Sequence, residues 1–190
     1  PRWRTDTNLS VWMEVPEELK EAPASVGDFN GDGLDDLVFY HSLNGQWWVA
    51  LSDGSGFGTP RPWLAGWAKG PGWKTFIGDY NGDSYDDLLV MQESDQGWQM
   101  AVNDSREGFQ PQPAYFSGLG EASWQQAVGD VNGDRTDDLI AYNTTTGTVQ
   151  VAQVFDSRIT APQTWMTGGE RFKQMVNGDF NGDSRCDLVF

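Results

Sequence analysis

Carboxylate and amide side chains recur at fixed spacing in four short loops of this 190-residue chain. The loops read GDFNGDGLDDL from Gly27, GDYNGDSYDDL from Gly78, GDVNGDRTDDL from Gly129 and GDFNGDSRCDL from Gly178. Counted from the residue after that first glycine, every copy has Asp, Asn, Asp and Asp at positions 1, 3, 5 and 9. Alternating oxygen donors in a tight loop can converge on one point, so each loop predicts a site for a hard cation.

Calcium is the cation that this donor set favours. Calcium takes six to eight oxygen ligands, magnesium prefers fewer protein ligands and retains waters, and zinc requires His or Cys, neither of which recurs. The glycine at position 4 allows the turn, and the backbone carbonyl at position 7 is a further ligand. We therefore expect about four Ca2+ ions, one per loop. The expected ligands are Asp28, Asn30, Asp32, Leu34 and Asp36; Asp79, Asn81, Asp83, Tyr85 and Asp87; Asp130, Asn132, Asp134, Thr136 and Asp138; and Asp179, Asn181, Asp183, Arg185 and Asp187.

Two other interpretations of the loops compete with this one. An EF-hand needs a bidentate Glu at position 12 between helices, but position 12 is apolar in all four copies. Asn-Gly and Asp-Gly turns are enriched in these residues for backbone reasons alone, and fourfold recurrence of all four positions argues against that explanation. Position 8 is Asp in three copies and Cys186 in the fourth, so we do not expect it to be a required ligand.

The loops mark a repeat, because their starts lie 51, 51 and 49 residues apart. Each repeat contains four short apolar or aromatic segments that predict strands, which is typical of a β-propeller blade. Ala50, Ala101 and Ala152 recur on one face of the second segment, which predicts close approach of neighbouring sheets. The segments are 37–40, 88–91, 139–142 and 188–190; then 47–52, 98–103 and 149–154; then 63–64, 115–116 and 165–166; and a last one that holds Trp73 or Trp124.

The sequence thus predicts an all-β fold, a single β-propeller domain or part of one over residues 1–190. Its repeats are 27–77, 78–128 and 129–177, flanked by partial blades at 1–26 and 178–190. We expect an arc of about four blades from a larger ring, whose other blades come from the same or another chain. We also expect the apolar run after each loop to be the inner strand of its blade.

Most of the formal charge of −16 is carried by the four loops. They hold 15 of the 28 acidic residues and two of the 12 basic ones, which leaves only −3 for the remaining chain. No basic stripe is present to bind phosphate, so nucleic-acid binding is not expected. No apolar stretch approaches the roughly 20 residues that a membrane span needs. One cysteine excludes an internal disulfide, and calcium could stabilise a secreted fold instead.

The D-x-N-x-D-G-x-x-D pattern of the first loop, followed by an apolar strand, resembles the FG-GAP and VCBS repeats of integrin α-subunit propellers and of many secreted microbial proteins. The segment WWVALSDGSGF over residues 47–57 is more similar to the microbial members, which include integrin-like propeller lectins. The resemblance covers nearly the whole chain. It implies structural calcium loops, a propeller that commonly has seven blades, and a secreted or cell-surface location.

The predicted function is an extracellular, calcium-stabilised binding or adhesion module for a carbohydrate or a protein partner, without catalysis. The alternatives are a non-catalytic scaffold in a larger secreted enzyme or toxin, such as a polysaccharide lyase or hydrolase, and a propeller with its own catalytic cleft. The chain has one histidine, His41, so no catalytic triad can recur. Tryptophans that keep the repeat period are expected to pack between strands and blades. Trp48 and Trp67 break the period and are the candidate ligand-binding residues.

Overall fold

The computed structural model describes residues 13–103, 108–121, 123–168 and 172–190. Apart from one 3₁₀ turn, η1 (Glu17–Leu19), its regular elements are strands. In the described part of the chain, no helix is long and apolar enough to cross a membrane. The strands are β1 (Ala24–Gly27), β2 (Asp36–His41), β3 (Gln46–Ala50), β4 (Arg61–Leu64), β5 (Trp73–Gly78), β6 (Asp87–Gln92), β7 (Trp98–Val102), β8 (Gln110–Phe116), β9 (Gln125–Gly129), β10 (Asp138–Asn143), β11 (Thr148–Ala152), β12 (Val154–Phe155), β13 (Arg158–Ile159), β14 (Gln163–Met166), β15 (Val176–Gly178) and β16 (Asp187–Val189).

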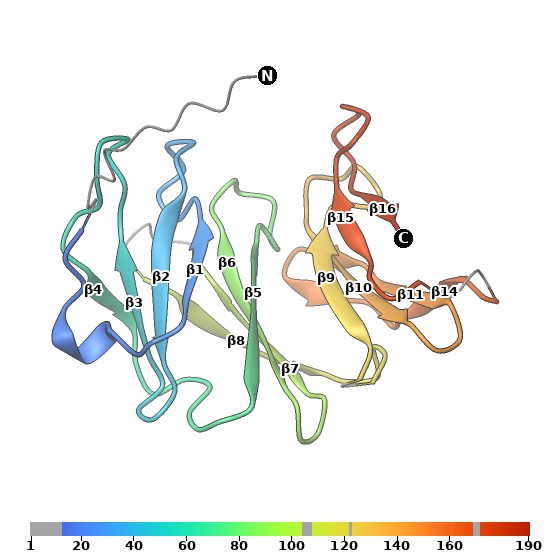
Figure 1. Cartoon of the computed structure of the whole chain (residues 1–190), viewed down its shortest axis with the longest axis horizontal. Helices are drawn as coiled ribbons and strands as arrows, with labels where there is room; N and C mark the ends of the chain where they lie inside the picture. Colours follow the sequence, from blue (N-terminus) through green and yellow to red (C-terminus); the bar gives the residue numbers. More distant parts are fainter. Residues whose placement is uncertain (1–12, 104–107, 122, 169–171) are drawn as a thin grey trace.

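Three four-stranded antiparallel sheets and one two-stranded sheet follow one another around an arc (Figure 1). Their strand orders are β1-β2-β3-β4, β5-β6-β7-β8, β9-β10-β11-β14 and β15-β16, and β12 and β13 form a small separate hairpin. These sheets are the propeller blades that the repeat predicts, and we number them blades 1 to 4. The sheets are offset from the loop-to-loop repeats, because each sheet begins with the strand that precedes its loop.

The inner strand of each blade is the one before the loop, so the expectation that the run after the loop is innermost was wrong. Strand β5 contacts both β1 and β9, and β15 contacts β9, which places these four strands side by side at the centre of the arc. The four loops join each inner strand to the next strand and lie together at the top of the view in Figure 1. Each loop therefore follows directly after an inner strand, near the centre of the arc.

Neighbouring blades pack face to face through buried apolar side chains. Trp47 and Val49 of blade 1 meet Leu88, Val90 and Ala101 of blade 2 in one cluster. Blades 2 and 3 meet in the same way, with Trp98 and Met100 packed against Leu139, Ala141 and Ala152. Blades 3 and 4 meet through Tyr142 and Val149, which pack against Leu188 and Phe190.

The recurring alanines of the third strands confirm the expectation of close sheet approach. Ala50, Ala101 and Ala152 are each 0% exposed. Ala101 and Ala152 lie on the face that their blade turns toward the preceding blade. On blade 1 this face is covered instead by Leu19, which is 1% exposed and packs on Phe39 and Ala50. Burial of a full leucine side chain contributes about 2 kcal/mol, so η1 is anchored to blade 1.

Candidate functional site

The aspartate at position 1 organises each loop by accepting hydrogen bonds from the loop's own backbone. Oδ1 of Asp28 accepts from the N–H of Gly31 at 2.7 Å and of Asp32 at 3.2 Å, and Oδ2 accepts from Gly33 at 2.8 Å. Asp79, Asp130 and Asp179 make the same three kinds of contact in their loops. One carboxylate therefore satisfies several N–H groups that a tight turn would otherwise leave without partners.

Positions 3 and 5 continue this pattern along the loop. Oδ1 of Asn30 accepts from the N–H of Asp32 at 2.9 Å, and Oδ1 of Asp32 accepts from the N–H of Leu34 at 2.9 Å. The Nδ2 atom of Asn30 donates to Oδ2 of Asp32 at 3.0 Å, and this pair recurs in the other three loops. The structure thus brings the predicted side chains of positions 1, 3 and 5 together in each loop.

Two residues in every loop have left-handed backbone. Position 4 is glycine throughout, with φ between 72° at Gly31 and 82° at Gly133 and Gly182, as the turn prediction requires. Position 6 is also left-handed, although only the first loop has glycine there. Ser84, Arg135 and Ser184 adopt φ of 69°, 75° and 65°. L-residues in this region cost roughly 1–2 kcal/mol, so three of the four loops contain local backbone strain.

Replacing Ser84 by glycine is expected to stabilise the chain by about 0.5–1 kcal/mol. The gain is smaller than the strain because glycine loses more backbone entropy on folding. Urea unfolding of Ser84→Gly measures it, with Ser94→Ala on an ordinary exposed turn as the control. An unfolding free energy below that of the unaltered chain contradicts the assignment of strain to position 6.

The aspartate at position 9 faces the interior, away from the loop surface. Asp36, Asp87 and Asp138 are 0% exposed. Oδ2 of Asp87 accepts from the N–H of Tyr80 at 3.0 Å, and Oδ1 accepts from the N–H of Asn103 at 2.7 Å. Asp36 and Asp138 make the equivalent pair of bonds. The buried carboxylate therefore ties the loop to a residue one or two positions beyond the end of the third strand of its blade.

Position 8, which we had not expected to be a required ligand, joins one blade to the preceding blade. Oδ2 of Asp86 accepts from the N–H of Asp28 at 2.7 Å, and the N–H of Asp86 donates to the carbonyl of Asp28 at 2.9 Å. Asp137 makes the same two bonds with Asp79, at 3.2 and 2.7 Å. Sequence reasoning missed this function because the partner is backbone, which no residue type reveals.

The glycine that begins each loop makes room for this contact. A Cβ atom at Gly78 would lie 2.2 Å from Oδ2 of Asp137, and one at Gly27 would lie 2.6 Å from Oδ2 of Asp86. At Gly129 the neighbour is the sulfur of Cys186, at 2.5 Å. The recurrence of glycine in all four copies was the available sequence signal.

The equivalent contact between blades 3 and 4 has a different side chain at position 8. The N–H of Cys186 keeps the backbone bond to the carbonyl of Asp130, at 2.6 Å. The Asn177 side chain donates to the carbonyl of Val128 at 2.7 Å. An amide therefore supplies the additional polar contact between blades 3 and 4 where a thiol replaces the carboxylate.

The joint aspartates are held in surroundings that disfavour their charged form. Burial, together with the nearby Asp86 carboxylate, raises the pKa of Asp137 to about 7. Burial likewise raises the pKa of Asp86 to about 6. Because the folded-state pKa exceeds the unfolded value of 3.8, this contribution to stability is complete below that value and is lost as the pH rises through 7.

Without divalent cations, the unfolding free energy is therefore expected to fall as the pH rises from about 4 to about 8. Urea unfolding at several pH values in chelator measures the slope. Asp137→Asn should reduce the slope without abolishing it, because the amide does not titrate whereas the buried Asp87, whose pKa burial raises to about 8, still does. A free energy that stays constant or increases over this range contradicts the prediction.

The loops fit calcium in donor chemistry, and the ion itself stays a prediction. The ion pairs between described residues join Lys20 to Glu17 and Lys74 to Glu93, so neither neutralises a loop carboxylate. However, no three or more His, Cys, Asp or Glu side chains converge on a common point within the described ranges. Positions 1, 3, 5 and 9 would hold an ion with the carbonyl at position 7. In the structure, oxygens at all four of these side-chain positions accept from backbone N–H groups, and their role as cation ligands stays a prediction.

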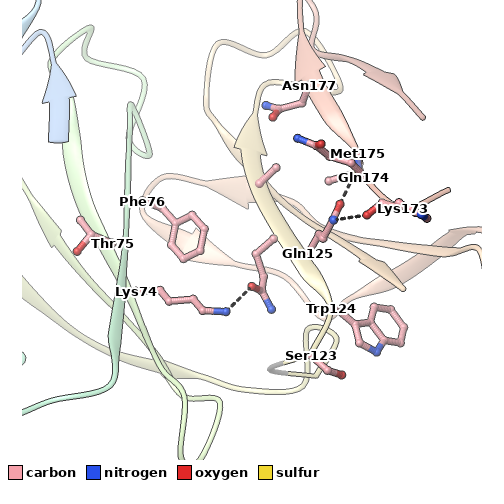
Figure 2. A pocket seen from close by; sticks show the side chains of 12 residues that line it. Lys74, Thr75, Phe76, Ser123, Trp124, Gln125, Lys173, Gln174, Met175 and Asn177 are labelled. Carbon is pink, nitrogen blue, oxygen red and sulfur yellow. Dashed lines mark hydrogen bonds between the residues drawn. The ribbon is translucent and has the colours of Figure 1, made fainter. Parts of the chain in front are cut away.

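A separate pocket of about 720 Å³ opens between the inner strands β5, β9 and β15 (Figure 2). Phe76 and Trp124 line it, although both rings are partly buried and also pack on the core between blades 2 and 3, and amides and lysines supply polar groups. Nζ of Lys74 donates to Oε1 of Gln126 at 3.3 Å and lies 3.7 Å from Oε1 of Glu93. The Gln125 amide donates to the carbonyl of Lys173 at 2.9 Å and accepts from the N–H of Met175 at 2.7 Å, which braces β9 against the next blade.

The two candidate ligand-binding tryptophans lie apart from this pocket and from each other. Trp48 packs in the cluster around Leu19 on the outer face of blade 1. Trp67 lies 5.6 Å from Trp47, centroid to centroid, between blades 1 and 2. Their role in ligand binding stays a prediction. The period-keeping Trp47 and Trp98 are buried between blades, as expected.

Comparison with known proteins supports the fold. The FG-GAP-like repeat model matches residues 28–90 and again 79–141, which together span more than half of the chain. The chain therefore belongs to the FG-GAP-like repeat family. A search of curated proteins gave no match.

Among solved structures, the chain is similar to an Agrocybe aegerita lectin that recognises non-reducing terminal N-acetylglucosamine. The TM-score is 0.66 at 16% sequence identity, so the likeness concerns the fold. The match covers 86% of this chain and 44% of the lectin chain. The chain thus spans less than half the length of that lectin.

Proposed function

We propose that this chain is an extracellular, calcium-stabilised module that binds carbohydrate and does not catalyse a reaction. The observation that carries the proposal is the pocket between the inner strands. It combines the aromatic rings of Phe76 and Trp124 with the polar side chains of Lys74, Gln126 and Lys173. Sugars present C–H faces that pack on aromatic rings and hydroxyls that bond amide and ammonium groups.

The charge of the pocket favours a neutral sugar over a polyanion. Glu93 lies beside Lys74 and offsets its charge, and the chain as a whole carries −16. Gln126 contributes an amide whose Oε1 accepts from Lys74 and whose Nε2 donates to the carbonyl of Glu121 at 3.1 Å. A ligand hydroxyl could replace these weak internal bonds at little cost, because one hydrogen bond would be exchanged for another.

The fold likeness to a lectin and the membership of the FG-GAP-like family support this class of ligand without identifying it. In this proposal, calcium neutralises the loop carboxylates and fixes the turn after each inner strand. Extracellular calcium concentrations are sufficient for such sites. The inner strands line the pocket and lead directly into the loops. In this proposal, ordering of the loops by calcium therefore also fixes the shape of the pocket.

A glycan array probed in calcium and in chelator tests the proposal. We expect binding to neutral glycans in calcium, at least about tenfold weaker for Gln126→Ala, which removes one polar group from the pocket. Gln112→Ala on the outer strand β8 is the matched control and should bind as the unaltered chain does. Absence of glycan binding in both conditions contradicts the proposal and favours the scaffold alternative.

A further inference from the structure

The chain contains three triplets of the form Asn-x-Ser/Thr, in which the asparagine can accept an N-linked glycan when a protein is secreted. They are Asn8-Leu-Ser, Asn103-Asp-Ser and Asn143-Thr-Thr. Asn8 lies outside the described residues. The sequence gives no reason to prefer Asn103 or Asn143, but the structure places the two amides in different surroundings.

The Asn103 amide is closed to modification in the folded chain. Its side chain is 0% exposed. Nδ2, the atom that would carry the sugar, donates to the carbonyl of Phe29 at 2.7 Å and to the carbonyl of Asp86 at 3.3 Å. A glycan would replace one of the two amide protons and would need room for a bulky saccharide. The folded chain therefore cannot carry a glycan at Asn103.

The Asn143 amide is bound to its own turn through its oxygen. Asn143 is the last residue of β10 and begins the turn that leads to β11. It is half-buried, and Thr145 and Thr146 of the turn are exposed. Oδ1 accepts from the N–H of Thr145 at 2.8 Å and of Thr146 at 3.0 Å. Within the described part of the chain, Nδ2 makes no hydrogen bond, so the fold does not use the atom that would carry the sugar.

The equivalent residue of blade 2 shows how the length of the side chain matters here. Gln92 is the last residue of β6, and its Nε2 donates to the carbonyl of Pro71 at 3.3 Å. Its Oε1 would lie 2.8 Å from a Cβ atom at Gly72, so the side chain lies against the segment before β5. Asn143 is one methylene shorter and bonds the backbone of its own turn instead.

We propose that Asn143 accepts an N-linked glycan and that Asn103 stays unmodified in the folded chain; this inference rests on the extracellular location in the proposed function. In the transfer, Nδ2 forms a bond to the anomeric carbon of an oligosaccharide, and the bond from that carbon to the oxygen of its lipid-pyrophosphate carrier breaks. Nδ2 loses one proton and the lipid pyrophosphate leaves. The amide oxygen is unchanged, so both hydrogen bonds of the turn are kept.

The attachment point lies away from the predicted cation site of the same blade. Strand β10 begins at Asp138 in the loop and ends at Asn143, so the turn and the loop are at opposite ends of the strand. A strand of this length spans about 17 Å. Glycan occupancy and calcium binding can therefore be measured independently of each other.

Secretion of the whole chain from a eukaryotic host, followed by glycopeptide mapping with mass spectrometry, tests the proposal. We expect a glycan on Asn143 and none on Asn103 in the secreted chain. Chain retained in the cells is mapped in the same way. An unmodified Asn143 in both fractions, or a glycan on Asn103 of the secreted chain, would overturn the proposal.

Two substitutions in the turn separate the acceptor pattern from the fold. Thr145→Ala removes the pattern but keeps Asn143 and its bonds to backbone N–H groups, so the glycan should be lost. Its melting temperature should stay within about 2 °C of that of the unaltered chain, because exposed substitutions change stability little. Thr144→Ala is the matched control, since it keeps the pattern and should keep the glycan. A glycan on Asn143 of Thr145→Ala, or its loss from Thr144→Ala, contradicts the assignment.

Failure of this inference is distinguishable from failure of the proposed function. The glycan array measures binding by the pocket and can be probed with chain from a bacterial host that adds no N-linked glycan. Binding on the array with an unmodified Asn143 in the eukaryotic host would overturn the glycosylation site alone.

Discussion

Asp87→Ala is expected to lower the free energy of unfolding by about 2–5 kcal/mol. The side chain is 0% exposed, and its two oxygens accept from the N–H groups of Tyr80 and Asn103. Removing it leaves two buried backbone donors without partners, and each costs roughly 1–3 kcal/mol. Denaturant unfolding in chelator measures the loss independently of any cation.

The matched control is Asp83→Ala at position 5 of the same loop. Asp83 is exposed and accepts from the N–H of Tyr85 at 2.9 Å, so water can replace it and the loss in chelator should be below about 1 kcal/mol. If Asp87 acted only as a cation ligand, its variant would unfold in chelator with the same free energy as the unaltered chain. That outcome would contradict the structural role given to position 9.

Gly78→Ala is expected to destabilise the chain by about 1–3 kcal/mol, since overpacking at a close joint has this cost. The new methyl group would meet the Asp137 carboxylate at 2.2 Å and displace it from the N–H of Asp79. Loss of this hydrogen bond weakens the contact between blades 2 and 3. Thermal or urea unfolding measures the change.

The double variant Gly78→Ala with Asp137→Ala shows whether the clash is the cause. In a double-mutant cycle, we expect the glycine substitution to cost about 1–2 kcal/mol less once the carboxylate is absent. Additive effects of the two substitutions would mean that the glycine is needed for another reason, such as its place at the end of β5.

The strands and the blade repeat could be predicted because their signals are local. Short apolar runs such as residues 88–91 became β6, and the 51-residue spacing of Trp47 and Trp98 placed equivalent strands in successive sheets. Which strands share a sheet could not be read in the same way. Strand β5 ends one sequence repeat yet pairs with β6 across the loop.

The candidate site was predictable to the extent that side chains carry its chemistry. The side chains of positions 1, 3 and 5 lie together in each loop through hydrogen bonds, and their role as cation ligands stays a prediction. The roles of Asp86 and Asp87 were not predictable, because their partners are backbone N–H groups brought close by packing of distant segments. The pocket between inner strands was missed for a similar reason: Lys74 and Gln126 meet only when two blades are side by side.

Thermal unfolding in calcium and in chelator, paired with calorimetric titration of the chelated chain by calcium, tests the central claim that the four loops are structural calcium sites. We predict about four bound ions and a melting temperature higher in calcium by at least about 5 °C, since cation binding to the folded chain alone stabilises it. Asp83→Ala should lose one ion. An unchanged melting temperature together with no calcium uptake would contradict the claim.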